Sequence, residues 1–189
     1  MTQSPDLAAL IGSRICHDLV NPLSAVCNGV ELLELSGVAP SEEMSLIRDS
    51  LANATARIQL FRFAFGPASD ALVAEAEMVK LLDTLSKGAR HCFVWQAGTV
   101  PRSNVRRMLL AMLCAETMTP LGGDVTITAD QTGWTVAASG RRITISSDAE
   151  AVLNGDIIDL PPAQVHFNVL AASAPVTFDY DDTSLTLKG

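Results

Sequence analysis

The sequence predicts an α+β fold: an N-terminal antiparallel helical hairpin that forms a dimeric four-helix bundle, followed by an α/β sandwich. Two observations predict this division, because apolar residues recur at helical spacing up to Gly66-Pro67, whereas runs typical of β-strands, separated by turn glycines, follow it. The chain has 189 residues, 48% of them hydrophobic, which is enough for a substantial core. We expect one domain over residues 1–67 and a second over residues 68–189.

The first helix is predicted over residues 5–35, because Gly37 and Pro40 follow it as the usual stop signal. At roughly 100° per residue, one set of aliphatic side chains falls roughly 120° to 220° from His17 around the helix axis, and we expect it to form a buried stripe. Its members are Ile11, Ile15, Leu19, Val26, Val30 and Leu33. His17 points away from this stripe, so we expect its ring to face solvent.

The second helix is expected to begin near Ser41, whose hydroxyl can cap free backbone amides, and to end at Gly66-Pro67. Its apolar residues keep a three-four spacing, as in a helix packed within a bundle: Met44, Ile47, Leu51, Ala54, Ile58, Phe61 and Phe65. Two helices of this length have more apolar surface than they can cover for each other. The simplest closure is a homodimer.

The second half alternates helical and strand patterns, which predicts the α/β sandwich. We expect helices over residues 75–86, 103–118 and 161–172, and strands over residues 91–95, 125–129, 134–138, 143–146, 176–180 and 184–187. The last two strands should form a hairpin around Asp181-Asp182.

Composition excludes several classes of function. A formal net charge of -8 argues against a general nucleic-acid surface, which needs clustered Lys and Arg. No apolar run approaches the roughly 18 to 20 residues of a membrane helix, and residues 1–6 carry no basic stretch of a signal peptide. We therefore expect a cytoplasmic protein without nucleic-acid or membrane partners. The four cysteines are scattered, so we expect buried free thiols and no metal site.

His17 lies at the centre of a polar strip on the first helix. Ser13, Asn21, Ser24, Asn28 and Glu31 fall within roughly 40° of it, and Arg14 within about 60°. A neutral imidazole is a competent nucleophile near pH 7, and it must be exposed for another protein to reach it. His17 is therefore the candidate nucleophile.

Two neighbours can support phosphoryl chemistry at His17. Asp18 can accept the proton of one ring nitrogen, which fixes the tautomer whose other nitrogen attacks phosphorus. Asn21, one turn on, can donate a hydrogen bond to phosphoryl oxygens. Pro22 lacks an amide hydrogen inside the helix, so we expect a kink beside the histidine.

The run His17-Asp18-Leu19-Val20-Asn21-Pro22-Leu23 resembles the phosphoacceptor box of histidine kinases, in which His is followed by an acid, then by Asn or Thr, Pro and an apolar residue. Residues 105–114 and 122–127 resemble the nucleotide-domain helix and following strand of the same enzymes. Cys114 falls where that family has a magnesium-binding Asn, and a thiol is a poor ligand for this hard cation. Ala138 replaces the adenine-binding Asp, Arg142 replaces a Gly, and no Gly-rich loop precedes the final helix. The resemblance implies a degenerate ATPase-like domain without ATP binding.

An acceptor box beside such a domain is similar to the ChpT-type histidine phosphotransferases of alphaproteobacteria, through residues 13–19 and 28–33. The resemblance implies a homodimeric phosphorelay protein: His17 accepts a phosphoryl group from the receiver domain of a hybrid kinase and passes it to receiver aspartates of response regulators. It implies catalytic roles for His17, Asp18 and Asn21, and a receiver-binding surface at Arg14, Val20, Ser24 and Asn28. The chain needs no cofactor of its own, because Mg²⁺ comes with the receiver.

Two alternatives stay open. A sensor kinase would phosphorylate itself from ATP, and the missing nucleotide-box residues argue against it. A dimeric partner that inhibits receivers or kinases by docking would keep every activity after His17→Gln, whereas a phosphotransferase would lose label transfer.

Overall fold

The computed structural model describes residues 7–37, 39 and 41–189. Residues 5, 6 and 40, which the sequence pattern assigns to the beginning of the first helix and its stop signal, lie outside the described residues. The chain divides into two compact units, residues 1–67 and residues 68–189. The α+β fold class, with a helical hairpin before a mixed sheet, is confirmed.

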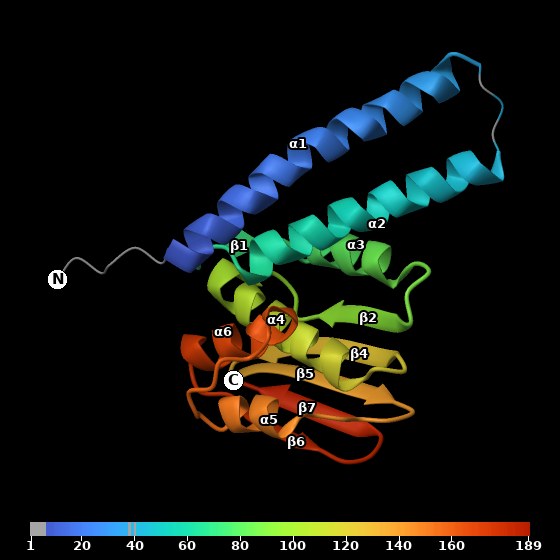
Figure 1. Cartoon of the computed structure of the whole chain (residues 1–189). Coiled ribbons are helices and arrows are strands. Elements are labelled where there is room, and N and C mark those ends of the chain that lie inside the picture. The colour runs from blue at the N-terminus through green and yellow to red at the C-terminus, as the bar shows by residue number, and fades with distance from the viewer. Residues whose placement is uncertain (1–6, 38, 40) are drawn as a thin grey trace. The chain divides into compact units, whose positions relative to one another are not determined.

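Unit 1 is an antiparallel hairpin of α1 (Leu7–Leu35) and α2 (Glu42–Ala64), shown in blue and cyan in Figure 1. Gly37 follows α1 with a φ of 85°, a conformation that favours glycine. Ser41 caps α2 by accepting a hydrogen bond from the amide of Met44 at 3.3 Å. An ion pair between Arg48 of α2 and Glu34 of α1, at 3.3 Å, joins the two helices near the turn.

The predicted buried stripe on α1 is wrong for a single chain. Of its six members only Val30 is buried, and the other five are 48–59% exposed. The reason is that α1 packs on α2 along a neighbouring face, which contains Cys16 and Val30 and where Gly12 lies against Phe65. The stripe of Ile11, Ile15, Leu19, Val26 and Leu33 therefore remains uncovered, and we call it the open stripe.

Unit 2 contains a five-stranded sheet in the order β2-β4-β5-β7-β6, in which β2 is parallel to β4 and the other pairs are antiparallel. These strands are β2 (His91–Gln96), β4 (Gly123–Asp130), β5 (Gly133–Gly140), β6 (Thr177–Tyr180) and β7 (Ser184–Lys188). The short β1 (Leu72–Val73) and β3 (Val100–Pro101) form a separate pair. The helices are α3 (Glu75–Ser86), α4 (Arg102–Met118), α5 (Ser147–Leu153), the 3-10 turn η1 (Pro162–Gln164) and α6 (Val165–Ser173).

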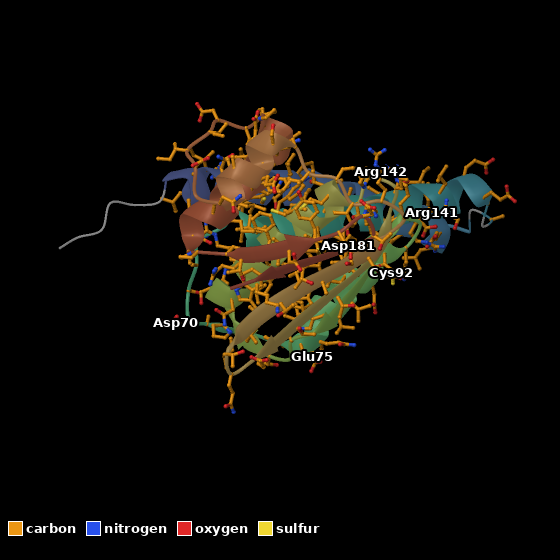
Figure 2. The ribbon with its side chains drawn as sticks, turned by 90° about the horizontal axis from the view of Figure 1, so that it is seen from below. Asp70, Glu75, Cys92, Arg141, Arg142 and Asp181 are labelled. Atoms are coloured by element: carbon orange, nitrogen blue, oxygen red, sulfur yellow. The ribbon has the colours of Figure 1, made fainter. Side chains whose placement is uncertain are left out.

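The core of unit 2 lies on one face of the sheet. α4 packs against β4 and β5, α3 packs against β2, and α6 packs against α4 (Figure 1). Along β2, the side chains of His91, Phe93 and Trp95 are buried and the alternate ones are exposed, as expected for a sheet covered on one side. Cys92, labelled in Figure 2, lies on the uncovered face and is exposed, and Cys27 of α1 is half-buried. The expectation of four buried thiols therefore holds only for Cys16 and Cys114.

The predicted strand over residues 143–146 is wrong. Its backbone groups bond outside any strand ladder: the amide of Ile143 donates to the carbonyl of Asp182 and that of Thr144 to the carbonyl of Met118, both at 2.8 Å. Ser146 instead caps α5 by accepting from the amide of Ala149 at 3.2 Å. The other predicted helices and strands are present within a few residues of their expected bounds, including the closing hairpin of β6 and β7.

No helix within residues 7–37, 39 and 41–189 combines the length and apolar character needed to cross a membrane.

Candidate functional site

His17 is the exposed histidine of the chain. Its side chain is 68% accessible on α1, whereas the other two histidines, His91 and His166, are buried in unit 2. The predicted polar strip surrounds it, because Asn21, Ser24, Asn28 and Glu31 are exposed and Ser13 is half-buried. The helical periodicity of α1 therefore places this ring where another protein can reach it.

Asp18 contacts both His17 and Arg14 through different carboxylate oxygens. Its Oδ1 lies 3.3 Å from Nδ1 of His17, and its Oδ2 accepts a hydrogen bond from Nε of Arg14 at 2.9 Å. The hydrogen bond with His17, followed by the charge and hydrogen bond of Arg14, holds the pKa of Asp18 below its ordinary value, while partial desolvation opposes this. The carboxylate is therefore ionised at neutral pH.

An ionised carboxylate can only accept hydrogen bonds, so the ring hydrogen of neutral His17 lies on Nδ1 when it bonds Asp18. Nε2 is then unprotonated and carries the lone pair. Because the ring is exposed, this lone pair is open to an electrophile brought by another molecule. The arrangement supplies an oriented nucleophile on a helix surface.

The structure brings three of the seven predicted site residues into contact, Arg14, His17 and Asp18. Asn21, Ser24 and Asn28 share the exposed face of α1 with them, and Val20 is half-buried beside that face. Sequence reasoning missed the pairing of Arg14 with Asp18, although opposite charges four residues apart on a helix are a signal that could have found it.

Pro22 lies within α1, which continues as one helix on both sides of it. Since Pro22 has no amide hydrogen, the carbonyl of Asp18 lacks its usual helical donor. The kink expected beside His17 stays a prediction.

The positions that resemble a nucleotide site carry poor ligands. Cys114 has no exposed surface within α4, and burial raises the pKa of its thiol well above the ordinary value. A neutral, buried thiol does not fit Mg²⁺, which prefers oxygen ligands. Ala138 is buried in β5 without a polar side chain, and Arg142 is exposed beyond the end of that strand (Figure 2). Among the residues whose placement is described, no group of three His, Cys, Asp or Glu could hold a metal ion.

The fold of this chain, a helical hairpin followed by an α/β sandwich, is similar to that of a solved bacterial phosphotransferase. That structure, at 1.7 Å, superposes with a TM-score of 0.66 and 24% identity over 100% of this chain and 98% of its own. The likeness defines the fold class.

The model of the protein family described as "Histidine phosphotransferase C-terminal domain" matches residues 75–176, which is more than half of the chain. This chain therefore belongs to the histidine phosphotransferase family. The protein phosphotransferase ChpT of Brucella abortus (strain 2308) is 36% identical over 126 residues, an alignment that covers 65% of this chain and 60% of that relative.

Proposed function

We propose that this protein is the histidine phosphotransferase of a two-component phosphorelay. His17 takes a phosphoryl group from an aspartyl phosphate on the receiver domain of a hybrid histidine kinase, and gives it to receiver aspartates of response regulators. The exposed imidazole with Nδ1 directed at Asp18 carries this proposal, because it leaves a free Nε2 on an accessible helix face. Membership of the family supports it.

The transfer forms one bond and breaks one. The lone pair of Nε2 attacks phosphorus in line, the bond between phosphorus and the receiver's carboxylate oxygen breaks, and that carboxylate leaves. The ring keeps its hydrogen on Nδ1 and becomes positively charged, so the ionised Asp18 at 3.3 Å stabilises the product electrostatically. Passage to a second receiver reverses these steps. No proton needs to leave the protein.

The remaining work is positioning, which is the main contribution of a protein to phosphoryl transfer. Asn21 lies one turn beyond His17 and donates to the phosphoryl oxygens, while Arg14, Val20, Ser24 and Asn28 contact the receiver surface. The Mg²⁺ that offsets the phosphoryl charge belongs to the receiver. The exposure of Arg14, Ser24 and Asn28 supports this assignment.

The working form is a homodimer. The open stripe leaves five large aliphatic side chains about half exposed on α1, and α2 adds Ile47 and Phe61, which are also exposed. Solitary surface apolar residues are ordinary, but a continuous row along a helix is typical of an interface. A second copy covers this row and places one His17 on each side of a four-helix bundle.

The second unit binds no ATP and supplies no phosphoryl group. The buried thiol of Cys114 and the apolar side chain of Ala138 replace the ligands that a nucleotide site needs.

The test is label transfer from a receiver domain that carries a ³²P-labelled aspartyl phosphate. Wild-type protein should acquire acid-labile label within minutes, and His17→Gln should acquire none. Because His17 is exposed, this substitution should change the free energy of unfolding by no more than about 0.5 kcal/mol. A docking protein without phosphotransfer would bind the receiver equally well before and after the substitution and take no label. Label from ATP alone would instead indicate a kinase.

A further inference from the structure

Asp18 does not face His17 by helical geometry alone. Consecutive residues on a helix point roughly 100° apart, so a carboxylate at the next position does not naturally meet the preceding ring. The contact between Oδ1 and Nδ1, at 3.3 Å, therefore requires the Asp18 side chain to lean toward the histidine. Something must favour that conformation in an exposed carboxylate.

Arg14 occupies the position that can do so. It lies one turn before Asp18 and about 60° around the axis from His17, between the directions of His17 and Asp18. Its Nε donates to Oδ2 of Asp18 at 2.9 Å, which leaves Oδ1 for the ring. The guanidinium thus draws the carboxylate toward the histidine and occupies the oxygen that does not contact it.

We propose that Arg14 is a positioning residue that holds Asp18 against Nδ1 of His17, and thereby favours the tautomer whose Nε2 is free. The consequence for transfer rests on the proposed function, whereas the tautomer bias exists in the protein without any receiver. Arg14 acts here through Asp18, a role separate from the receiver contact proposed above.

The low pKa of Asp18 is consistent with this role, because Arg14 contributes to it by charge and by hydrogen bond after the larger contribution of the hydrogen bond with His17. The ion pair is exposed, with Arg14 75% and Asp18 50% accessible, and its order on the helix, with the base before the acid, is the weaker one. We therefore expect a modest effect, about a twofold change in the tautomer ratio, when Arg14 is replaced.

The experiment is ¹⁵N NMR of histidine-labelled full-length protein at pH 8.5, where the shifts of the two ring nitrogens report the tautomer. The His17 signals are those that disappear in His17→Gln. Arg14→Gln should lower the ratio of the Nδ1–H to the Nε2–H tautomer about twofold, and Arg14→Lys should restore part of it. Asp18→Ala should remove the bias. In 1 M KCl the wild type should resemble Arg14→Gln, while Arg14→Gln itself should not change, because salt screens exposed ion pairs.

Equal tautomer ratios in wild type and Arg14→Gln would overturn the proposal, whether or not Asp18→Ala differs from them. Transfer from a labelled receiver distinguishes failure of the phosphotransfer function from failure of the positioning role of Arg14. If wild-type protein takes no label while the tautomer ratio still depends on Arg14, the phosphotransfer function fails and the positioning role stands. If the protein takes label but the tautomer ratio does not depend on Arg14, the positioning role is contradicted and the phosphotransfer function stands.

Discussion

The ring of His166 donates a hydrogen bond from Nε2 to the hydroxyl oxygen of Thr117 at 3.0 Å. That hydroxyl uses its own hydrogen to bond the carbonyl of Leu113, also at 3.0 Å, so its oxygen acts as the acceptor. Burial lowers the pKa of His166 to about 4, against the opposing charge of Glu116. The ring is therefore neutral in the folded protein at neutral pH, and its role is structural.

This histidine should make stability fall in mild acid. Above pH 6.5 the ring is neutral in both folded and unfolded chains, but between pH 6.5 and about 4 only the unfolded chain takes up the proton. The free energy of unfolding should therefore drop as pH falls through this window, by up to about 3 kcal/mol from this group. Urea unfolding at pH 7 and pH 4.5 measures the drop.

His166→Gln is the matched control, since glutamine keeps an N–H donor but does not titrate. Carboxylates titrate in both proteins, so the difference between the two pH profiles isolates the histidine. Parallel profiles would contradict the prediction.

Gly122 is expected to be intolerant of a side chain. Its φ is +87°, and a Cβ atom there would overlap the carbonyl oxygen of Arg90, where β2 and β4 begin to pair. Gly122→Ala should lower the free energy of unfolding by at least about 2 kcal/mol, through backbone strain and the clash together. Gly88 has a φ of +68° with no atom within 4 Å of its Cβ position, so Gly88→Ala should cost only about 1 kcal/mol. Equal losses in the two variants would show that the clash is relieved cheaply.

The long elements could be predicted from sequence because their apolar spacing repeats over many residues, as in α1 and α2. The failures have local causes. Ile143 and Ile145 alternate as in a strand, but the segment is too short for periodicity to separate it from an extended connection. The helix that follows, α5, was not predicted, although Ser146 followed by Asp148 and Glu150 is a recognisable helix start.

The site could be predicted to a similar extent. The polar face around His17 follows from helical geometry alone, so the exposed ring was predictable. The burial of the apolar stripe on α1 could not be predicted, because periodicity identifies an apolar face but does not tell which partner covers it. Cys16 illustrates the difficulty: it lies beside the exposed His17 in sequence, yet it is buried in the helix pair.

Substitutions at two adjacent leucines, one inside the open stripe and one outside it, should show whether the stripe is the dimer interface. Leu33 belongs to the stripe and is 48% exposed, while Leu32 is 63% exposed on the side of α1 that bears His17. Leu33→Glu should weaken the homodimer at least about tenfold, because an interface would bury an unpaired carboxylate. Leu32→Glu should leave the dimer unchanged. Sedimentation equilibrium measures both, and equal dissociation constants for the two variants would place the interface elsewhere.

The nucleotide-like unit should not regain ATP binding by a single reversion. Cys114→Asn restores the residue type that the kinase resemblance expects, but the side chain has no exposed surface. Its amide would be buried, so the free energy of unfolding should fall by roughly 2 to 4 kcal/mol if the amide finds no partner. Cys92→Asn, at an exposed position of β2, should change it by no more than about 0.5 kcal/mol. Isothermal titration with Mg²⁺ and ATP should give no binding heat for either variant. Nucleotide binding by a stable Cys114→Asn protein would mean that α4 still faces a usable site.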